Sequence, residues 1–355
     1  FAAARAGILT IPINTWCRDS EVSHLLRLGR CKGIFIDPAF HNIDFAGILA
    51  RVVAEFEAAG DNPLRWVCST GDAQCDIPSV PNVSLRALQQ LGTDAPKLRR
   101  EPAEPSPAGE CVIAFTTSGT TAAPKLALHR EGALIAHAEA IARRARMTSS
   151  DVALAALPPC GAYGYCLILA AMAAGCRAVQ CREFSVDLAV DVIPAQSVSV
   201  LALTEPLFRK MFDHPAASRD AFRSLRAVFS AGATLEPVVQ RAEDEFGFRL
   251  TNVYGSSEIL ALAAFWGAAE NVAERAQAWG ILTSTGMRVR AADDAGNILP
   301  PGGVGELQFT GPIVTAGYLG NGGATRAAFT DDGWFRSGDL GRVLDEDGSS
   351  FHYLA

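Results

Sequence analysis

The sequence lacks a long hydrophobic run, an excess of basic residues and a recognisable secretory signal. Its longest apolar stretch, residues 166–176, is far shorter than the ~20 residues that a membrane helix needs, so we expect no membrane span. The 355 residues carry a net charge of −7 without a basic stripe, which argues against nucleic acid as a partner. Residues 1–7 lack the pattern of a signal peptide, and we expect a cytoplasmic protein.

The cysteines show neither a Cys-x-x-Cys pair nor an accompanying histidine cluster, which argues against a zinc site. Most have apolar neighbours, as expected for buried thiols in a reducing compartment. The nine are Cys17, Cys31, Cys68, Cys75, Cys111, Cys160, Cys166, Cys176 and Cys181.

The composition and the hydrophobic periodicity indicate a globular α/β protein. Apolar residues make up 49% of the chain and charged residues 19%. Short apolar segments that we expect to be strands, such as 8–13, 33–37 and 65–69, alternate with segments of helical spacing, such as 45–56. This alternation predicts mostly parallel sheets flanked by helices. From residue 286 onward short strands and turns predict a small β-rich subdomain, so we expect an α/β region over 1–285 and a β subdomain over 286–355.

The segment 117–125 follows an apolar run (111–115) that reads as a buried strand, and it precedes a helix expected over 131–146. Its residues 117–121 have hydroxyl groups or no side chain, and Lys125 adds a positive charge. Small residues let backbone N–H groups approach an anion, so this chemistry suits a polyphosphate. The spacing is not that of a Walker loop. By itself the segment is also compatible with an ordinary loop.

The segment 117–125 resembles the phosphate-binding loop of the adenylate-forming superfamily, which contains acyl-CoA synthetases, aryl-CoA ligases and adenylation domains. Three further stretches match that superfamily in the same order: 254–258 (Tyr-Gly-Ser-Ser-Glu), 305–312 with 317–318, and 333–340. The resemblance covers most of the chain and implies that this is the large N-terminal domain, truncated at both ends. A hinge and a mobile C-terminal domain would follow.

The resemblance implies activation of a carboxylic acid by ATP to an acyl-adenylate, with transfer of the acyl group to coenzyme A. Thr117, Lys125 and Glu258 would serve catalysis, and Glu258 would hold Mg²⁺. Tyr254 can stack on the purine, and Asp339 would accept the ribose hydroxyls, although an aspartate in a turn can also be structural. The expected nucleotide site comprises Thr117, Ser118, Gly119, Thr120, Thr121, Lys125, Gly232, Ala233, Thr234, Asn252, Tyr254, Gly255, Ser256, Ser257 and Asp339.

The acid pocket is expected around two segments that follow strands, 160–164 and 230–234. The superfamily usually has an aromatic residue or histidine where this chain has Gly161, which enlarges the pocket or leaves its wall to Cys160 and Tyr163. Packing of Tyr163 against the sheet remains an alternative, as does a tight turn at 230–234. Residues 160–166 contain no acid to pair an α-ammonium group, so we expect an uncharged carboxylic acid. The expected substrate residues are Cys160, Gly161, Tyr163, Ser230, Ala231 and Gly232.

Two loop positions where the superfamily has glycine hold Ala122 and Leu126, which resist a positive φ. Three functions therefore stay open: an acyl- or aryl-CoA ligase, an adenylation domain that loads a carrier protein, and a catalytically inactive nucleotide- or acyl-binding homologue. The partner is a small carboxylic acid in the first two, and a homodimer is also left open.

Overall fold

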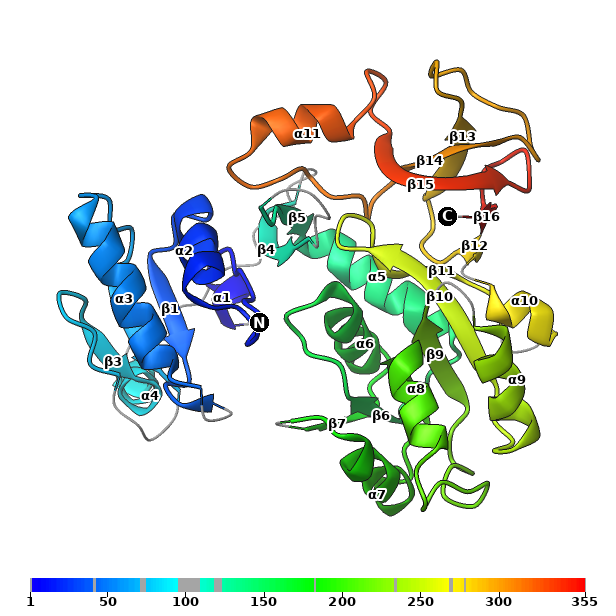
Figure 1. Cartoon of the computed structure of the whole chain (residues 1–355), viewed down its shortest axis with the longest axis horizontal. Helices are drawn as coiled ribbons and strands as arrows, with labels where there is room; N and C mark the ends of the chain where they lie inside the picture. Colours follow the sequence, from blue (N-terminus) through cyan, green and yellow to red (C-terminus); the bar gives the residue numbers. More distant parts are fainter. Residues whose placement is uncertain are drawn as a thin grey trace. The chain divides into compact units, whose positions relative to one another are not determined.

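The computed structural model describes residues 2–40, 43–70, 75–94, 109–117, 123–181, 183–232, 235–267, 271–277 and 279–354. Figure 1 shows the course of the chain. The helices are α1 Ala2–Arg5, α2 Asp19–Leu28, α3 Phe45–Ala58, α4 Leu85–Asp94, α5 Glu131–Arg144, α6 Ala162–Ala173, α7 Val186–Gln196, α8 Glu205–Phe212, α9 Glu236–Asp244, α10 Val272–Ala276 and α11 Gly322–Ala328. The strands are β1 Gly33–Ile36, β2 Trp66–Ser69, β3 Asn82–Ser84, β4 Cys111–Thr116, β5 Leu126–Arg130, β6 Val152–Ala155, β7 Arg177–Gln180, β8 Val200–Thr204, β9 Ala227–Ala231, β10 Leu250–Ser256, β11 Leu260–Phe265, β12 Gly280–Leu282, β13 Arg288–Ala292, β14 Val304–Thr310, β15 Phe335–Val343 and β16 Ser350–Tyr353.

The chain divides into two compact units. The smaller unit comprises Ile13–Gly109 and Ser118–Leu126. Its strands β1, β2 and β3 form a parallel sheet in that order. Helices α2 and α3 supply much of its core, in which the Phe56 side chain is completely buried.

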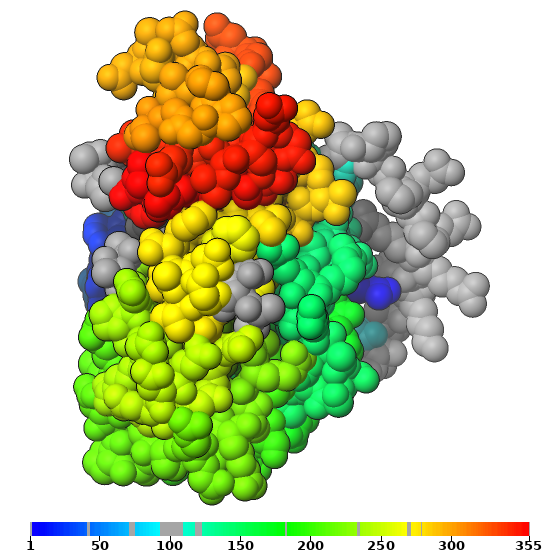
Figure 2. All heavy atoms as spheres, turned by 90° about the vertical axis from the view of Figure 1, so that its right-hand side faces the viewer, coloured from blue at the N-terminus to red at the C-terminus, as the bar shows by residue number. Residues whose placement is uncertain are grey.

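The larger unit comprises Phe1–Pro12, Glu110–Thr117 and Ala127–Ala355. Its sheet has eleven strands in the order β13-β14-β15-β16-β12-β11-β10-β9-β8-β6-β7. The strands from β10 to β7 are parallel, and those from β13 to β11 are antiparallel. Strands β10 and β11, which are neighbours in sequence, pair antiparallel where the two regions meet. Figure 2 shows red residues of the C-terminal strands beside yellow residues of the α10 to β12 region.

Alternating side chains of the parallel strands enter two separate cores. On β9, Phe229 packs in the core that includes residues of α5 and α6, whereas Val228 packs in the core that includes residues of α7, α8 and α9. Such alternation follows from the period of two along a strand. The parallel region therefore has helices on both faces, as the sequence predicts.

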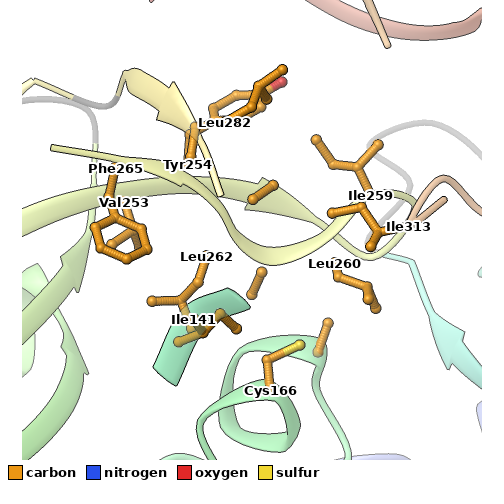
Figure 3. Close-up of a cluster of buried hydrophobic side chains, with 14 of the residues drawn as sticks. Ile141, Cys166, Val253, Tyr254, Ile259, Leu260, Leu262, Phe265, Leu282 and Ile313 are labelled. Atoms are coloured by element: carbon orange, nitrogen blue, oxygen red, sulfur yellow. The ribbon is translucent and has the colours of Figure 1, made fainter. Parts of the chain in front are cut away.

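Strand β11 is buried along its whole length. Leu260 and Leu262 have positive φ angles of 63° and 61°, a region that non-glycine residues rarely occupy. Figure 3 shows both leucine side chains on the side of the strand that faces Ile141 of α5 and Cys166 of α6. Both are fully buried, and this burial offsets the backbone strain, which is about 1–3 kcal/mol for each residue.

The structure confirms the predicted α/β fold and differs from the sequence-based expectations in places. The segment 8–13 was expected to be a strand, but only Thr10 pairs, in a single bridge with Ile113; Pro12 has no N–H to continue the pairing. The β-rich segment after residue 286 is not a separate sheet, because β12 and β16 connect it to β11. The boundary at residues 285 and 286 stays a prediction. The segments 71–74 and 95–108 lie outside the described residues.

A buried carboxylate connects the beginnings of three parallel strands. Asp151, just before β6, accepts hydrogen bonds from Ser199 Oγ at 2.7 Å and from Thr148 N at 2.8 Å. It also forms an ion pair with Arg226, whose Nε lies 2.7 Å from Oδ1. Burial raises the pKa of Asp151, but the hydrogen bonds from Arg226, Ser199 and Thr148 outweigh it and lower that pKa to about 2.

Replacing Asp151 by alanine should destabilise the larger unit, because it leaves the partly buried Arg226 and Ser199 without their shared acceptor. We expect the free energy of unfolding to fall by about 2 kcal/mol, measured by urea denaturation. Asp220→Ala is the matched control, since Asp220 pairs with Arg223 on the surface and such pairs contribute little. Equal effects of the two substitutions would contradict the assignment.

Candidate functional site

Residues 256–258, the last residue of β10 and the turn that follows it, depend on close approach of β10 and β11. A Cβ atom at Gly255 would lie only 2.4 Å from Leu260 O and 2.7 Å from the Cα of Ala261, so a side chain there would force the strands apart. The pairing register shifts between Tyr254 and Ser256. Glycine at position 255 therefore allows the turn, which contains the predicted residues Ser256, Ser257 and Glu258.

Hydrogen bonds from two other segments hold the turn in place. Ser257 Oγ donates to Thr116 O, at the end of β4, at 3.1 Å. The Nε2 atom of His129, on β5, donates to Ser257 O at 2.7 Å. Thr116 is the last residue before Thr117, so the turn lies beside the beginning of the predicted phosphate loop.

Glu258 is bonded through its backbone and through its side chain. Its N–H donates to Ser256 Oγ at 3.1 Å, and its carbonyl accepts from Thr315 N at 2.6 Å. Its Oε1 atom accepts a hydrogen bond from the Tyr318 hydroxyl at 2.9 Å. Burial, together with the negative charge and the hydrogen bond of Glu258, raises the pKa of Tyr318. Tyr318 therefore remains a neutral donor at physiological pH.

A second tyrosine–carboxylate pair lies beside the first. The Tyr254 hydroxyl donates to Oδ2 of Asp339 on β15. Asp339 N donates to Ser337 Oγ at 3.0 Å. Burial raises the pKa of Asp339; the Tyr254 hydrogen bond opposes this effect, and the charge of Glu258 adds to it. The charge of Glu258 therefore reaches Asp339, and the two carboxylates lie near each other.

The Tyr254 ring is only 7% exposed. It stacks on Phe309 with ring centres 5.7 Å apart and contacts Phe351 edge-on at 5.0 Å. This packing fixes the ring and aims its hydroxyl at Asp339. Stacking of Tyr254 on a purine stays a prediction.

The parallel strands place Asn252 and Ser230 opposite each other in register. Both are completely buried. Asn252 Nδ2 donates to Gly232 O at 2.9 Å and to Ala276 O at 3.0 Å, so it shapes the backbone after β9. Ser230 Oγ has no hydrogen-bond partner among the described residues. Ala231 ends β9, and Ala233 and Thr234 lie outside the described residues.

The predicted acid pocket begins at the N-terminal end of α6. Gly161 is exposed, and a Cβ atom there would meet only Pro158 O, at 3.9 Å. Cys160 is half-buried. The Tyr163 hydroxyl is buried without a partner among the described residues, and burial raises its pKa. Open space at Gly161 and a buried hydroxyl at Tyr163 are both compatible with a pocket for an acyl group, which stays a prediction.

Only the two ends of the predicted phosphate loop are described. Ser118, Gly119, Thr120, Thr121 and Ala122 lie outside the described residues. The Thr117 side chain is buried, and its Oγ1 atom has no hydrogen-bond partner among them.

At the other end of the loop, Lys125 precedes β5 in the smaller unit. Pro124 O accepts a hydrogen bond from His24 Nε2 at 2.8 Å. Leu126, the second departure from the superfamily pattern, is a completely buried strand residue without a positive φ.

Sequence reasoning did not identify His129, Thr315 or the contact made by Tyr318. His129 stands between the short apolar stretch 126–128 and two charged residues, and the Gly317-Tyr318 motif had no assigned role. Of the residues that the structure describes, no three histidine, cysteine, aspartate or glutamate side chains gather as a metal-binding group. No described helix is long and apolar enough to cross a membrane.

Comparison with known proteins shows the family of the chain. The AMP-binding enzyme family matches residues 1–319, and the chain belongs to this family. It is 29% identical to the indoleacetate–CoA ligase of Aromatoleum aromaticum over 100% of this chain and 64% of that protein. It is 28% identical to the salicyl-AMP ligase / salicyl-S-ArCP synthetase of Mycobacterium tuberculosis, over 98% of this chain and 59% of that protein. The chain thus spans about three fifths of the length of these curated relatives.

Solved structures share the fold. ATP-bound MatB from Rhodopseudomonas palustris superposes with a TM-score of 0.78 at 21% identity, over 100% of this chain and 65% of that one. A putative long-chain-fatty-acid CoA ligase from Rhodopseudomonas palustris has a TM-score of 0.80 at 25% identity, over 100% of this chain and 81% of that one.

Two buried histidines should make the stability of the chain depend on pH. Burial lowers the pKa of His129 and of His137 from 6.5 to about 4, partly opposed by their bonds to Ser257 O and Ala261 O. Between these values the unfolded chain binds protons that the folded chain does not. The free energy of unfolding should therefore fall as the pH is lowered from 6.5 towards 4.

Urea denaturation at several pH values tests this dependence. His137→Gln should reduce the slope of the free energy of unfolding against pH by the equivalent of about one proton. A dependence that His137→Gln does not alter would contradict the assignment.

Proposed function

We propose that the chain takes part in the ATP-dependent activation of a carboxylic acid to an acyl-adenylate with release of pyrophosphate. The observation that carries this proposal is the convergence of Glu258 and Asp339 at one site, each accepting a hydrogen bond from a buried tyrosine. Membership of the AMP-binding family supports the same nucleotide chemistry. The reaction requires little covalent work from the protein; it requires that the carboxylate and the α-phosphate are held in line.

Each predicted residue receives a role consistent with its surroundings. Asp339 is half-buried and accepts a hydrogen bond from the Tyr254 hydroxyl. It can also accept hydrogen bonds from the ribose hydroxyls. Thr117 has a buried hydroxyl without a partner among the described residues, which suits a phosphate oxygen. Lys125, with Ser118, Gly119, Thr120 and Thr121, completes the proposed cradle for the β- and γ-phosphates.

The donor set fits Mg²⁺, which is usually held by one or two carboxylates together with substrate phosphates. Glu258 supplies the proposed carboxylate. When bound, the ion neutralises phosphate charge, and it would also reduce the repulsion between Glu258 and Asp339. A dedicated cage of three or more acidic, histidine or cysteine side chains is not needed for this chemistry.

We propose coenzyme A as the acyl acceptor and an uncharged acid as the substrate. One curated relative is an indoleacetate–CoA ligase, which supports coenzyme A as the acyl acceptor and an organic acid as the substrate. Another is a salicyl-AMP ligase / salicyl-S-ArCP synthetase, which supports a carrier protein as the alternative acceptor. A cytoplasmic location and a homodimer stay expectations.

The nucleotide site can be tested by calorimetric titration of this chain with Mg·ATP and with pyrophosphate. Asp339→Ala should lower the affinity for ATP at least about tenfold, which corresponds to the loss of one hydrogen bond to a charged group. It should leave pyrophosphate affinity unchanged, because pyrophosphate has no ribose. The exposed Asp331 provides the matched control, and Asp331→Ala should bind both ligands normally. An equal loss of affinity for ATP and for pyrophosphate would show that Asp339 does not bind the ribose. Failure of the wild type to bind either ligand would count against the proposal.

The acid pocket can be tested by filling the space at Gly161. Gly161→Phe should lower kcat/KM for large acids by about tenfold or more relative to small ones, because a ring would occupy space that the glycine leaves open. A panel of carboxylic acids in a pyrophosphate-release assay measures this ratio. Gly132→Phe is a control, because a Cβ atom at Gly132 of α5 also meets open space. An unchanged acid profile in Gly161→Phe would place the pocket elsewhere.

A further inference from the structure

Tyr318 makes the only hydrogen bond that the structure describes to the Glu258 carboxylate. The Tyr318 ring is 6% exposed, so the hydroxyl approaches Oε1 from within the protein. Glu258 forms no ion pair with any described residue, and Oε2 accepts no hydrogen bond from one. A carboxylate with one oxygen occupied and the other available is suited to binding one cation in a fixed direction.

We propose that Tyr318 is a positioning residue, which orients the Glu258 carboxylate towards the divalent cation that accompanies ATP. This inference rests on the proposed function and assigns a residue outside the expected nucleotide, acid and metal sites. Tyr318 would act through Glu258 and would not itself touch the cation. Its hydroxyl fixes the rotation of the carboxylate, so that less side-chain freedom is lost when the cation binds.

The backbone around Tyr318 is built to hold the ring in one place. Gly317 has a φ of 122°, and a Cβ atom there would lie 2.7 Å from Thr325 Cγ2, so the position requires glycine. Tyr318 N donates to Thr325 Oγ1 at 2.9 Å. Tyr318 also forms an antiparallel bridge with Ala127 at the beginning of β5.

The same segment holds the backbone of Glu258. Thr315 N donates to Glu258 O, and Thr315 Oγ1 donates to Leu128 O at 2.9 Å. Leu128 N in turn donates to Gly317 O at 3.0 Å. Residues 315–318 therefore extend along β5 and contact Glu258 at two points, its carbonyl and its carboxylate. Because one segment holds both the carbonyl and the carboxylate of Glu258, the direction of the Glu258 side chain is fixed.

The charges at the site agree with this role. Burial and the negative charge of Glu258 both raise the pKa of Asp339, so the two carboxylates lie near each other. The Tyr318 hydroxyl restricts rotation of the Glu258 carboxylate, and the Tyr254 hydroxyl restricts rotation of the Asp339 carboxylate.

The test is the affinity of Mn²⁺ for the complex of this chain with ATP, measured by electron paramagnetic resonance. Tyr318→Phe keeps the buried ring and removes only the hydroxyl. The dissociation constant of Mn²⁺ should rise about tenfold, as for other residues that support a metal ligand. ATP affinity in EDTA should stay unchanged, and the melting temperature should fall by a few degrees at most, the effect of one lost hydrogen bond. Tyr165→Phe, at a tyrosine on α6 that packs edge-on against Phe115, is the control and should keep the wild-type Mn²⁺ affinity.

A double-variant comparison separates positioning from general damage. Glu258→Gln removes the carboxylate, so adding Tyr318→Phe to this variant should not lower the affinity for Mn²⁺ any further. Unchanged Mn²⁺ affinity in Tyr318→Phe would overturn the inference and leave the proposed function standing. An equal loss of Mn²⁺ and of metal-free ATP affinity would overturn it too, since a purely structural defect affects both. Failure of the wild type to bind ATP with Mn²⁺ would overturn both proposals.

Discussion

The turn at residues 256–258 depends on hydrogen bonds from three separate segments, and the candidate site depends on this turn. Thr116, His129 and Thr315 each bond a different group of the turn. These three contacts join residues far apart in sequence, so the position of the turn depends on β4, β5 and the segment 315–318.

The paired carboxylates show how the protein keeps negative charge in a partly buried place. Neutral tyrosine hydroxyls, not lysine or arginine, satisfy Glu258 and Asp339. A basic partner would neutralise each carboxylate and compete with any cation or ribose that approaches it. A tyrosine satisfies one oxygen and leaves the negative charge in place. The pair is thus stable in the folded chain while it retains its capacity to bind a ligand.

The sequence predicts the α/β class and several of its helices and strands, because the spacing of apolar residues reflects which side chains are buried. Helix α3, for example, follows the expected spacing of residues 45–56 with only its end extended. Strand β5 was not expected, since five residues that include His129 and Arg130 give a weak alternation. The pairing of Tyr254 with Asp339 could not be read from the sequence either, because 85 positions separate them. Motifs locate candidate side chains along the chain, whereas their mutual contacts depend on the sheet order.

The continuity of the eleven-stranded sheet also affects how the chain can be divided. Strand β12 lies before residue 286, yet it pairs with β16 at the other end of the chain segment. A fragment that begins after residue 285 would expose the edge of β16, and the complementary fragment would expose the edge of β12. Unpaired strand edges of this kind promote aggregation. The C-terminal strands are therefore a poor choice as an exchangeable module, and a chimaera would better keep β11 to β16 from a single parent.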